Sequence, residues 1–395
     1  MDFLTIKDLD LANKRILVRV DFNVPLDNGK ITNDKRIKAS LPTIKYLLGK
    51  NCKVILMSHL GKPQKLIKKG KTLEEVKAKL TLKPVASRLS ELLGKEVTFL
   101  EDCITDIPNK PLILLENLRF HKEEKKNDEN FAKKLASYAD FYINDAFGTC
   151  HRAHASVDTI TKFLPSAAGF LVEKEIDNLT PIINPKKPFT VIIGGAKEDK
   201  IEVIKSLINK VDYLIISGIL SNTFLKAQGT DIEHSKFSSE SIDFAKNIIS
   251  KYEKKILLPL DVVVADKFDK NANSKVVSVD NIPHDWMTMD IGPKTIKLYK
   301  KKLKKSKTIF WAGPVGVFEF DKFANGTRAI AEFISNLDAT TVIGGGDSAS
   351  AVEKYNLQDK MTFVSTGGGA SLAFVEGKKL PALKALEESY KKFKK

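Results

Sequence analysis

The segment from Thr341 to Ser350 (TVIGGGDSAS) joins an apolar, strand-like run to a helix-like one through three glycines. Glycines at such a junction let a ligand approach the backbone closely, and the first N–H groups of a helix attract anions such as phosphate. Asp347 stands where that phosphate would bind, and their repulsion disappears if Asp347 holds a divalent cation between them. The segment therefore indicates a magnesium–nucleotide site. Taken alone, it fits an ordinary glycine turn with Asp347 as the helix N-cap equally well.

A second group of polar side chains follows four predicted strands in the first half of the chain. The group comprises Asp21, Asn23, His59, Lys62, Glu116, Asn117, Arg119, Asn144, Asp145, Thr149, His151, Arg152 and His154. The carboxyl ends of parallel strands meet at one edge of a sheet, where ligands bind. Arg36 lies in the first turn of a predicted helix, whose dipole also favours an anion. The group predicts a pocket for a small phosphorylated or carboxylated metabolite.

Each of these residues also has a structural interpretation of about equal weight. Asp21 would then cap a turn, Arg119 would form a surface ion pair, and His151 and His154 would be buried structural histidines. The repetition of polar groups at four strand ends favours the pocket. Arginine is rare among the 65 basic residues, so an arginine at a ligand-like position suggests a need for its bidentate fork.

The elements that must position these residues alternate between strand-like and helix-like segments. We predict strands at 15–22, 52–57, 97–100, 112–115, 141–143, 189–193, 213–216, 256–258, 308–311, 342–343 and 362–364, and helices at 34–48, 82–93 and 128–138. This alternation predicts an α/β fold with mostly parallel sheets covered by helices. A length of 395 residues favours two domains. We place their join in a long helix over 167–183, ended by Pro181 and Pro185.

Composition narrows the possible partners. The net charge of +16 comes from scattered lysines without a stripe of interleaved aromatic residues, which favours solvated surfaces over nucleic-acid binding. The three cysteines, Cys52, Cys103 and Cys150, lack metal-site spacing and predict free thiols in a reducing cytoplasm. The sequence contains no apolar span of membrane length, no signal-peptide pattern, no P-loop motif and no strand-linked G-x-G-x-x-G.

Long motifs follow one another in order along nearly the whole chain. They are RVDFNVP at 19–25, SHLG at 58–61, ENLRF at 116–120, NDAFGTCHRAH at 144–154, GGAK at 194–197, DIGPKT at 290–295, GPVGVFE at 313–319, GGGDS at 344–348 and STGGGAS at 365–371. This series strongly resembles the phosphoglycerate kinase family. A set so long and so ordered is far more specific than one glycine motif.

The resemblance implies two Rossmann-like lobes that face each other across a hinged cleft. An N-terminal lobe at 1–166 would bind 3-phosphoglycerate or 1,3-bisphosphoglycerate, and 167–185 would form a connecting helix and hinge. A C-terminal lobe at 186–376 would bind Mg-ADP or Mg-ATP, and a tail at 377–395 would return to the first lobe. The implied activity is reversible, Mg²⁺-dependent phosphoryl transfer between 1,3-bisphosphoglycerate and ADP in glycolysis, by a cytoplasmic monomer. Neither a membrane nor nucleic acid is expected as a partner.

The resemblance also assigns site residues by position. The positions matching the acid-substrate site are Asp21, Asn23, Arg36, His59, Arg119 and Arg152, with Lys62 where the family usually has arginine. Those matching the nucleotide site are Lys197, Lys200, Gly292, Glu319, Gly345, Gly346, Asp347 and Ser348, with Asp347 as the Mg²⁺ ligand. The catalytic cations would be Arg36 and Lys197, which neutralise the migrating phosphoryl group.

Three departures from the family pattern affect the nucleotide lobe. Lys197 and Lys200 are one step closer together than usual, Ser217–Leu220 replaces a glycine-rich run, and Ala312 replaces an asparagine. They leave open a catalytically impaired phosphoglycerate-kinase-like protein as an alternative. The charge of +16 leaves open a nucleic-acid-binding or surface-binding role in addition to the kinase. Because Arg36, Lys197, Glu319 and Asp347 are present, we favour an active kinase.

Overall fold

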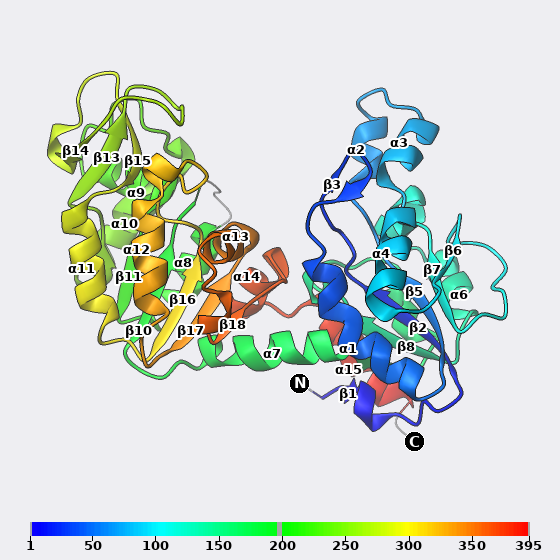
Figure 1. Ribbon diagram of the computed structural model, residues 1–395. Coiled ribbons are helices and arrows are strands. Elements are labelled where there is room, and N and C mark those ends of the chain that lie inside the picture. Colours follow the sequence, from blue (N-terminus) through cyan, green and yellow to red (C-terminus); the bar gives the residue numbers. More distant parts are fainter. Residues whose placement is uncertain (1, 196–199, 394–395) are drawn as a thin grey trace. The chain divides into compact units, whose positions relative to one another are not determined.

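The computed structural model describes residues 2–195 and 200–393, which fall into two compact units. The first unit contains Met1–Ile176 and Lys379–Lys395, and the second contains Asp177–Lys378. Each has a sheet covered by helices (Figure 1). The α/β fold with large parallel sheets is confirmed.

The first unit is built on a seven-stranded parallel sheet in the order β1-β9-β8-β2-β5-β7-β6. Its strands are β1 (Leu4–Thr5), β2 (Arg15–Val20), β5 (Lys53–Met57), β6 (Thr98–Leu100), β7 (Leu112–Leu115), β8 (Phe141–Asp145) and β9 (Ser166–Ala168). Its helices are α1 (Lys35–Gly49), α2 (Pro63–Ile67), α3 (Leu73–Leu80), α4 (Lys83–Leu93), α5 (Lys122–Lys125), α6 (Glu129–Ala136) and α15 (Pro381–Phe393), and β3 (Leu26–Asp27) and β4 (Lys30–Ile31) form a hairpin.

Local sequence signals explain where the helices of this unit begin and end. Asp34 occupies the N-cap position of α1, and the Asn33 side chain accepts a hydrogen bond from the Lys35 N–H at 3.0 Å. Gly94 ends α4 in the left-handed conformation (φ 62°), which costs glycine little because it has no Cβ. The predicted ends of both helices are therefore confirmed to within one or two residues.

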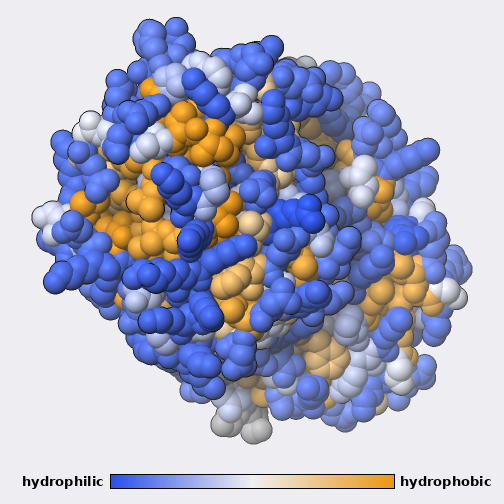
Figure 2. Space-filling model, turned by 60° about the vertical axis from the view of Figure 1, so that its left-hand side comes forward, coloured by the Kyte–Doolittle hydropathy of each residue, from blue (hydrophilic) through white to orange (hydrophobic). Residues whose placement is uncertain are grey.

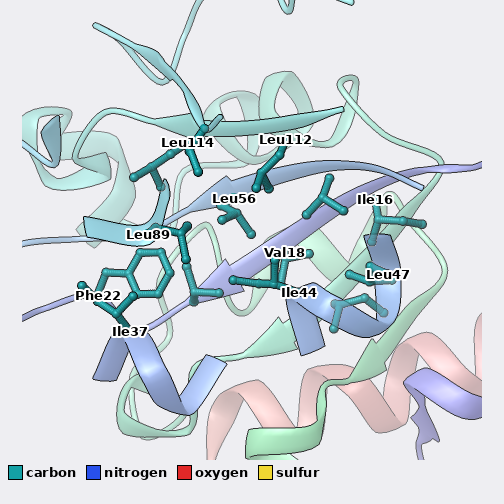
Figure 3. Packing of buried hydrophobic residues seen from close by; sticks show 14 of the residues in the cluster. Ile16, Val18, Phe22, Ile37, Ile44, Leu47, Leu56, Leu89, Leu112 and Leu114 are labelled. Atoms are coloured by element: carbon teal, nitrogen blue, oxygen red, sulfur yellow. The ribbon is translucent and has the colours of Figure 1, made fainter. Parts of the chain in front are cut away.

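The core of the first unit lies between one face of the sheet and helices α1 and α4 (Figure 3). Ile16 and Val18 of β2 pack there with Ile44 of α1 and Leu89 of α4, all fully buried. Each such side chain contributes about 1.5–3 kcal/mol through burial. Because side chains alternate along a strand, Arg19 points to the opposite face of the sheet.

The second unit has a six-stranded parallel sheet in the order β12-β11-β10-β16-β17-β18. The strands are β10 (Phe189–Ile193), β11 (Tyr213–Ile216), β12 (Ile256–Leu257), β16 (Thr308–Ala312), β17 (Thr340–Gly344) and β18 (Phe363–Val364). The helices are α8 (Ile201–Leu207), α9 (Gly218–Ala227), α10 (Ile242–Tyr252), α11 (Pro293–Leu303), α12 (Asn325–Ile334), α13 (Gly346–Lys354) and α14 (Gly369–Val375).

A separate antiparallel sheet in the second unit was not predicted. It has the order β14-β13-β15, with β13 at Asp261–Ala265, β14 at Ser274–Ser278 and β15 at Met287–Ile291. Strand β14 lies at the edge of this sheet and is half-exposed. Its residues do not alternate between buried and exposed, so its sequence resembles that of a loop. Sequence periodicity does not distinguish a strand of a small antiparallel sheet from an extended loop.

The helix predicted over 167–183 begins later than expected. Helix α7 spans Phe170–Ile183, because Ser166–Ala168 form β9 and pair with β8 and β1. Pro181 lies inside the helix rather than ending it. The boundary between the units, after Ile176, falls within α7.

The surface and the cysteines agree with the composition. Hydrophilic side chains cover most of the face shown in Figure 2, and hydrophobic ones gather in a broad patch on it. All three cysteines are free, as predicted, and all three are buried. Among the described helices, none combines the length and apolarity needed to cross a membrane.

Asp145 links the end of β8 to the beginning of α7. Its carboxylate is fully buried and accepts a hydrogen bond from the Leu171 N–H at 2.9 Å. Burial raises the pKa of Asp145 to about 7, and the Leu171 N–H opposes that rise. Asp145 therefore has a structural role instead of facing a ligand.

We expect this carboxyl group to make stability pH-dependent. The folded chain holds the Asp145 proton up to about pH 7, whereas an unfolded chain releases it near pH 4. Because the folded state binds more protons in this window, its free energy of unfolding falls as pH rises, by up to about 1.4 kcal/mol per pH unit. Asp145→Asn should flatten this dependence in urea denaturation between about pH 4.5 and 7.

Asp140→Asn is the matched control, because Asp140 lies just before the same strand and is half-exposed beside Arg15. The Arg15 hydrogen bond lowers the pKa of Asp140, so its contribution is lost at lower pH and has the opposite sign. The buried Asp290, with a pKa of about 7, adds a residual slope to every variant. An unchanged slope in Asp145→Asn would contradict the assignment.

Candidate functional site

The carboxyl ends of β2, β5 and β8 meet at one edge of the first sheet, where Arg19 pairs with Met57 and Val20 pairs with Asp145. Asp21 follows this edge and forms an ion pair with Arg36 from the first turn of α1. Gly148, in the turn after β8, passes close beside them: a Cβ at that position would lie 2.6 Å from Asp21 Oδ2. The structure thus brings together two predicted site residues, Asp21 and Arg36. We use the name basic site for the side chains at or just after the ends of β2, β5, β7 and β8 at this edge, together with Arg36 of α1.

His59 is buried in the basic site as a neutral imidazole. Its Nδ1 lies 3.0 Å from Arg19 Nη2. Burial lowers the pKa of His59 well below 6.5, and the positive charges of Arg19 and Arg119 lower it further. Because the arginine can only donate, Nδ1 accepts, and the proton of the neutral ring sits on Nε2. His59 can therefore donate a hydrogen bond from Nε2.

Arg119 carries an unsatisfied donor. It is 3% exposed, and its Nη1 donates to the Gly61 carbonyl at 2.8 Å. Its Nε is buried without a hydrogen-bond partner among the described residues. Burial lowers the pKa of Arg119 to about 10, and the nearby charges of Arg19 and Arg152 add to this effect. An anion in the basic site would satisfy the donor and offset the repulsion.

The remaining predicted residues of the basic site, Asn23, Arg152 and Lys62, differ in their exposure and in their hydrogen-bond partners. Asn23 accepts a hydrogen bond from the Gly61 N–H at 2.8 Å and so orients the turn after β5. Arg152 Nε donates to His151 Nε2 at 3.0 Å. Lys62 is exposed at the N-terminal end of α2.

Several other predicted candidates are structural. Asn117, Asn144, Thr149 and Glu116 hydrogen-bond to neighbouring backbone groups. His154 is buried, and its pKa is lowered to about 3 by burial and by Arg119, so it is neutral.

Two cations of the basic site were missed in the sequence. Arg19 is fully buried and donates from Nε to Ser156 Oγ at 2.9 Å. An arginine within an apolar strand is unusual in this lysine-rich chain, and this could have identified Arg19 as a site residue from the sequence. Lys125 has its pKa lowered by burial and by Arg119, Arg152 and Lys62, which places it beside the group. Its sequence context, KEEKK, reads as an ordinary solvated helix face.

The second unit presents glycines at the carboxyl edge of its sheet. The strand ends Ile193, Ala312 and Gly344 are in register across β10, β16 and β17. Gly194, Gly313 and Gly345 therefore begin the turns at this edge, which we call the glycine edge. A Cβ on Gly194 would collide with the Pro314 carbonyl, so these turns need glycine for close backbone packing.

Lys200 is buried at the glycine edge. Its exposed fraction is 6%, and its ammonium group donates to the Gly194 carbonyl. The predicted catalytic residue Lys197 lies outside the described residues. Two of the departures from the family pattern lie at this edge. Ala312 is the buried end of β16, and Gly218, from the replaced run Ser217–Leu220, begins α9 where a Cβ would collide with the Gly195 backbone.

Helix α13 begins at this edge. Gly345 occupies its N-cap position with φ 91°, so the alternative with Asp347 as the N-cap is wrong. Asp347 lies in the first turn and is exposed. Ser348 is fully buried, where its hydroxyl donates to the Gly344 carbonyl at 3.1 Å and accepts from the Gly313 N–H. Ser348 thus links two strand ends, while the neighbouring Asp347 is exposed.

The other two predicted nucleotide residues, Gly292 and Glu319, lie in other turns of the second unit. Gly292 is the N-cap of α11, whose first N–H groups already donate to the Asp261 carboxylate at 2.8–3.0 Å. Gly292 allows this approach, because a Cβ there would collide with Asp261. The neighbouring Leu260 is 51% exposed and offers an apolar surface. Glu319 is exposed and follows Phe318, which packs with Ala351 of α13.

Comparisons with known proteins identify the same family over nearly the whole chain. Residues 6–378 match the family model described as phosphoglycerate kinase. The cytosolic phosphoglycerate kinase of Triticum aestivum is 53% identical, with 98% of each chain covered. The phosphoglycerate kinase of Moorella thermoacetica is 50% identical over 98% of this chain and 99% of its own.

Solved structures give the same result. The phosphoglycerate kinase from Coxiella burnetii has a TM-score of 0.86 and 40% identity, covering 98% of this chain and 99% of its own. The enzyme of that name from Pyrococcus horikoshii also has a TM-score of 0.86, at 33% identity, covering 99% of this chain and 100% of its own. With sequence motifs, a family model and complete structures in agreement, the chain belongs to the phosphoglycerate kinase family, whose members are phosphotransferases of glycolysis.

Proposed function

We propose that the chain catalyses reversible, Mg²⁺-dependent phosphoryl transfer between 1,3-bisphosphoglycerate and ADP, giving 3-phosphoglycerate and ATP. The observation that carries most weight is the buried, unsatisfied Nε–H of Arg119 beside Arg19 and Arg152. An anion bound among these guanidinium groups would offset their mutual repulsion and satisfy the free donor. The cytoplasmic location, the monomeric state and the hinged closure implied by the family resemblance belong to the same proposal.

The basic site suits the phosphoglycerate. Arg119 and Arg152 would bind its phosphate bidentately, and His59 Nε2–H would donate to one of its oxygens. Arg36 is one-third exposed and held by Asp21, so its guanidinium can face the reacting carboxyl group while its position stays fixed. Asn23 supports the turn that carries the Gly61 carbonyl and therefore Arg119. Lys62 and Lys125 would add a positive electrostatic field, screened by solvent, at the exposed side of the basic site.

The glycine edge suits the nucleotide. The Gly345 and Gly346 backbone and the N-terminus of α13 favour phosphate oxygens, and Lys200 and Lys197 would add positive charge beside them. Leu260 offers apolar surface to a flat base. Asp347 fits Mg²⁺, which takes one or two carboxylates and completes its shell with water and phosphate oxygens. When bound, Mg²⁺ would neutralise charge on the phosphates. Gly292 and Glu319 would act at the margin of this site.

The reaction requires little covalent chemistry from these residues. The acceptor, a carboxylate or a phosphate oxygen, is already ionised, so no general base is needed. The protein must hold the two oxygens in line and compensate the charge on the migrating group. Arg36 and Lys197 would supply that compensation as the catalytic cations. His59 stays neutral across the physiological range, so its hydrogen bond is constant.

The direct test is steady-state transfer from ATP to 3-phosphoglycerate, coupled to reduction of the acyl phosphate, with and without Mg²⁺. We expect turnover that depends on the metal, at ordinary enzymatic rates of about 1–1,000 s⁻¹. Folded protein without turnover would instead support the impaired-enzyme alternative. Separate titrations of ADP and 3-phosphoglycerate would then identify the unit that has lost its ligand.

Arg36→Ala should reduce kcat by about 10²–10³, the typical loss of one donor to transition-state charge. Arg15→Ala is the matched control, because Arg15 lies at the opposite end of β2 and forms an exposed pair with Asp140. Both variants are measured at saturating substrates, with far-UV circular dichroism to verify folding. Near-normal turnover of Arg36→Ala would remove this residue from the mechanism.

Asp347→Asn should raise the Mg²⁺ concentration needed for half-maximal rate by on the order of tenfold or more, because an amide binds the ion more weakly than a carboxylate. Binding of 3-phosphoglycerate, followed by calorimetry, should stay unchanged. Asp359→Asn, an exposed aspartate after α13, is the control. Equal Mg²⁺ dependence in all three proteins would show that the ion does not use Asp347.

A further inference from the structure

A cluster of three metal-binding side chains lies in the first unit, and the proposed reaction does not use it. Asp102 and Cys103 follow β6, and His121 follows the short helical turn Leu118–Phe120. One ligand atom from each residue lies within 4.8 Å of the other two. Among the described residues, this is the group whose spacing could hold an ion.

The Cys103 thiol differs from the other two thiols. Cys52 donates to the Leu11 carbonyl at 3.0 Å, and Cys150 donates to the Ala146 carbonyl at 3.7 Å. Cys103 is equally buried, at 1% exposure, but within the described chain its sulfur hydrogen-bonds to no other residue. Its sulfur faces an imidazole and a carboxylate instead. A carboxylate and an imidazole beside a thiol are the donors that a transition-metal ion of the zinc type takes.

The other two ligands are already oriented. His121 Nε2 lies 2.7 Å from Asp102 Oδ1, and Phe131 packs against the imidazole with ring centroids 5.5 Å apart. The same Asp102 oxygen accepts from the Ile104 N–H at 3.0 Å. The side chains of His121 and Asp102 are 30% and 45% exposed. An ion could therefore enter from solvent and keep a water molecule as a further ligand.

We propose that Cys103, His121 and Asp102 form a binding site for a divalent transition-metal ion of the zinc type, with water in the fourth position. Thiolate, imidazole and carboxylate together suit Zn²⁺ or Co²⁺ and do not suit Mg²⁺. Metal bonds of about 2.0–2.3 Å in a tetrahedron put the ligand atoms roughly 3.3–3.8 Å apart. Small side-chain shifts reach this geometry, with the ion between Nε2 and Oδ1 where a proton now lies.

Binding has a defined proton balance. The S–H bond of Cys103 breaks as the sulfur–metal bond forms, and the proton passes to solvent. When Nε2 of the singly protonated His121 ring binds the ion, the proton between Nε2 and Oδ1 moves to Nδ1 through solvent, so the ring loses none, and ionised Asp102 has none to lose. Each bound ion therefore releases about one proton, and affinity rises with pH.

Cobalt is the probe for a test with the full chain, without nucleotide and under a phosphine reductant. Titration with Co²⁺ should produce a thiolate-to-cobalt charge-transfer band that saturates at about one equivalent, with about one proton released per ion. Zn²⁺ should abolish the band by displacement, and excess Mg²⁺ should leave it intact. Cys103→Ser should eliminate the band, whereas Cys52→Ser should retain it.

A second variant keeps the test independent of any folding defect at the buried cysteine. His121→Gln should weaken Zn²⁺ binding by on the order of tenfold or more, since even outer-shell changes cost about that much. His284→Gln controls for nonspecific metal binding, because His284 is an exposed histidine that pairs with Glu233 and Asp285. The proposal is overturned if folded wild-type protein shows no thiolate band, or if the band or Zn²⁺ affinity is unchanged in both Cys103→Ser and His121→Gln.

Discussion

Mutual repulsion among buried guanidinium groups is the constraint on which the first unit depends. Arg19 and Arg119 are almost fully buried; burial lowers the pKa of Arg119 and of His59, and the nearby charge of Arg19 lowers both further. A fold tolerates this only when other bonds hold the groups in place. Arg19 is bound by Ser156 and the Val20 carbonyl, and Ser156 is in turn bound by the buried Glu124. The parallel sheet supplies the rigid edge on which these bonds converge.

The carboxyl edge of the second sheet is built by different means. Its edge carries turns that bring backbone atoms together, and the close contacts of Gly194 and Gly313 leave no room for a side chain. Backbone donors and a helix terminus attract phosphate without burying several charges. The two units thus share one sheet geometry but differ in the groups at the carboxyl edge. In the proposed reaction, the fixed cations of the first unit would bind the small acid, and the backbone and exposed Asp347 of the second would bind the magnesium–nucleotide.

Much of this organisation was predictable, because hydrophobic alternation and glycine positions are local signals. The strand ends and helix starts around Asp21, Arg36 and Asp347 were found from neighbouring residues. Local signals fail where tertiary packing decides. Nothing near Asp145 shows that a helix will bury it, and nothing near Lys125 shows that the charges of Arg119 and Arg152 will lower its pKa. The Cys103–His121 pair likewise depends on two turns that meet only after the sheet forms.

The first unit takes its last helix from the far end of the chain. Helix α15 packs beside β9, with Ala382 N–H donating to the Cys150 carbonyl and Ser389 Oγ donating to the Leu164 carbonyl. All of Asp177–Lys378 leaves the ribosome before this helix does. The first unit therefore cannot bury the apolar surface that α15 covers until the whole of the second unit has been synthesised. The unit that begins first along the chain is the last to have all of its residues.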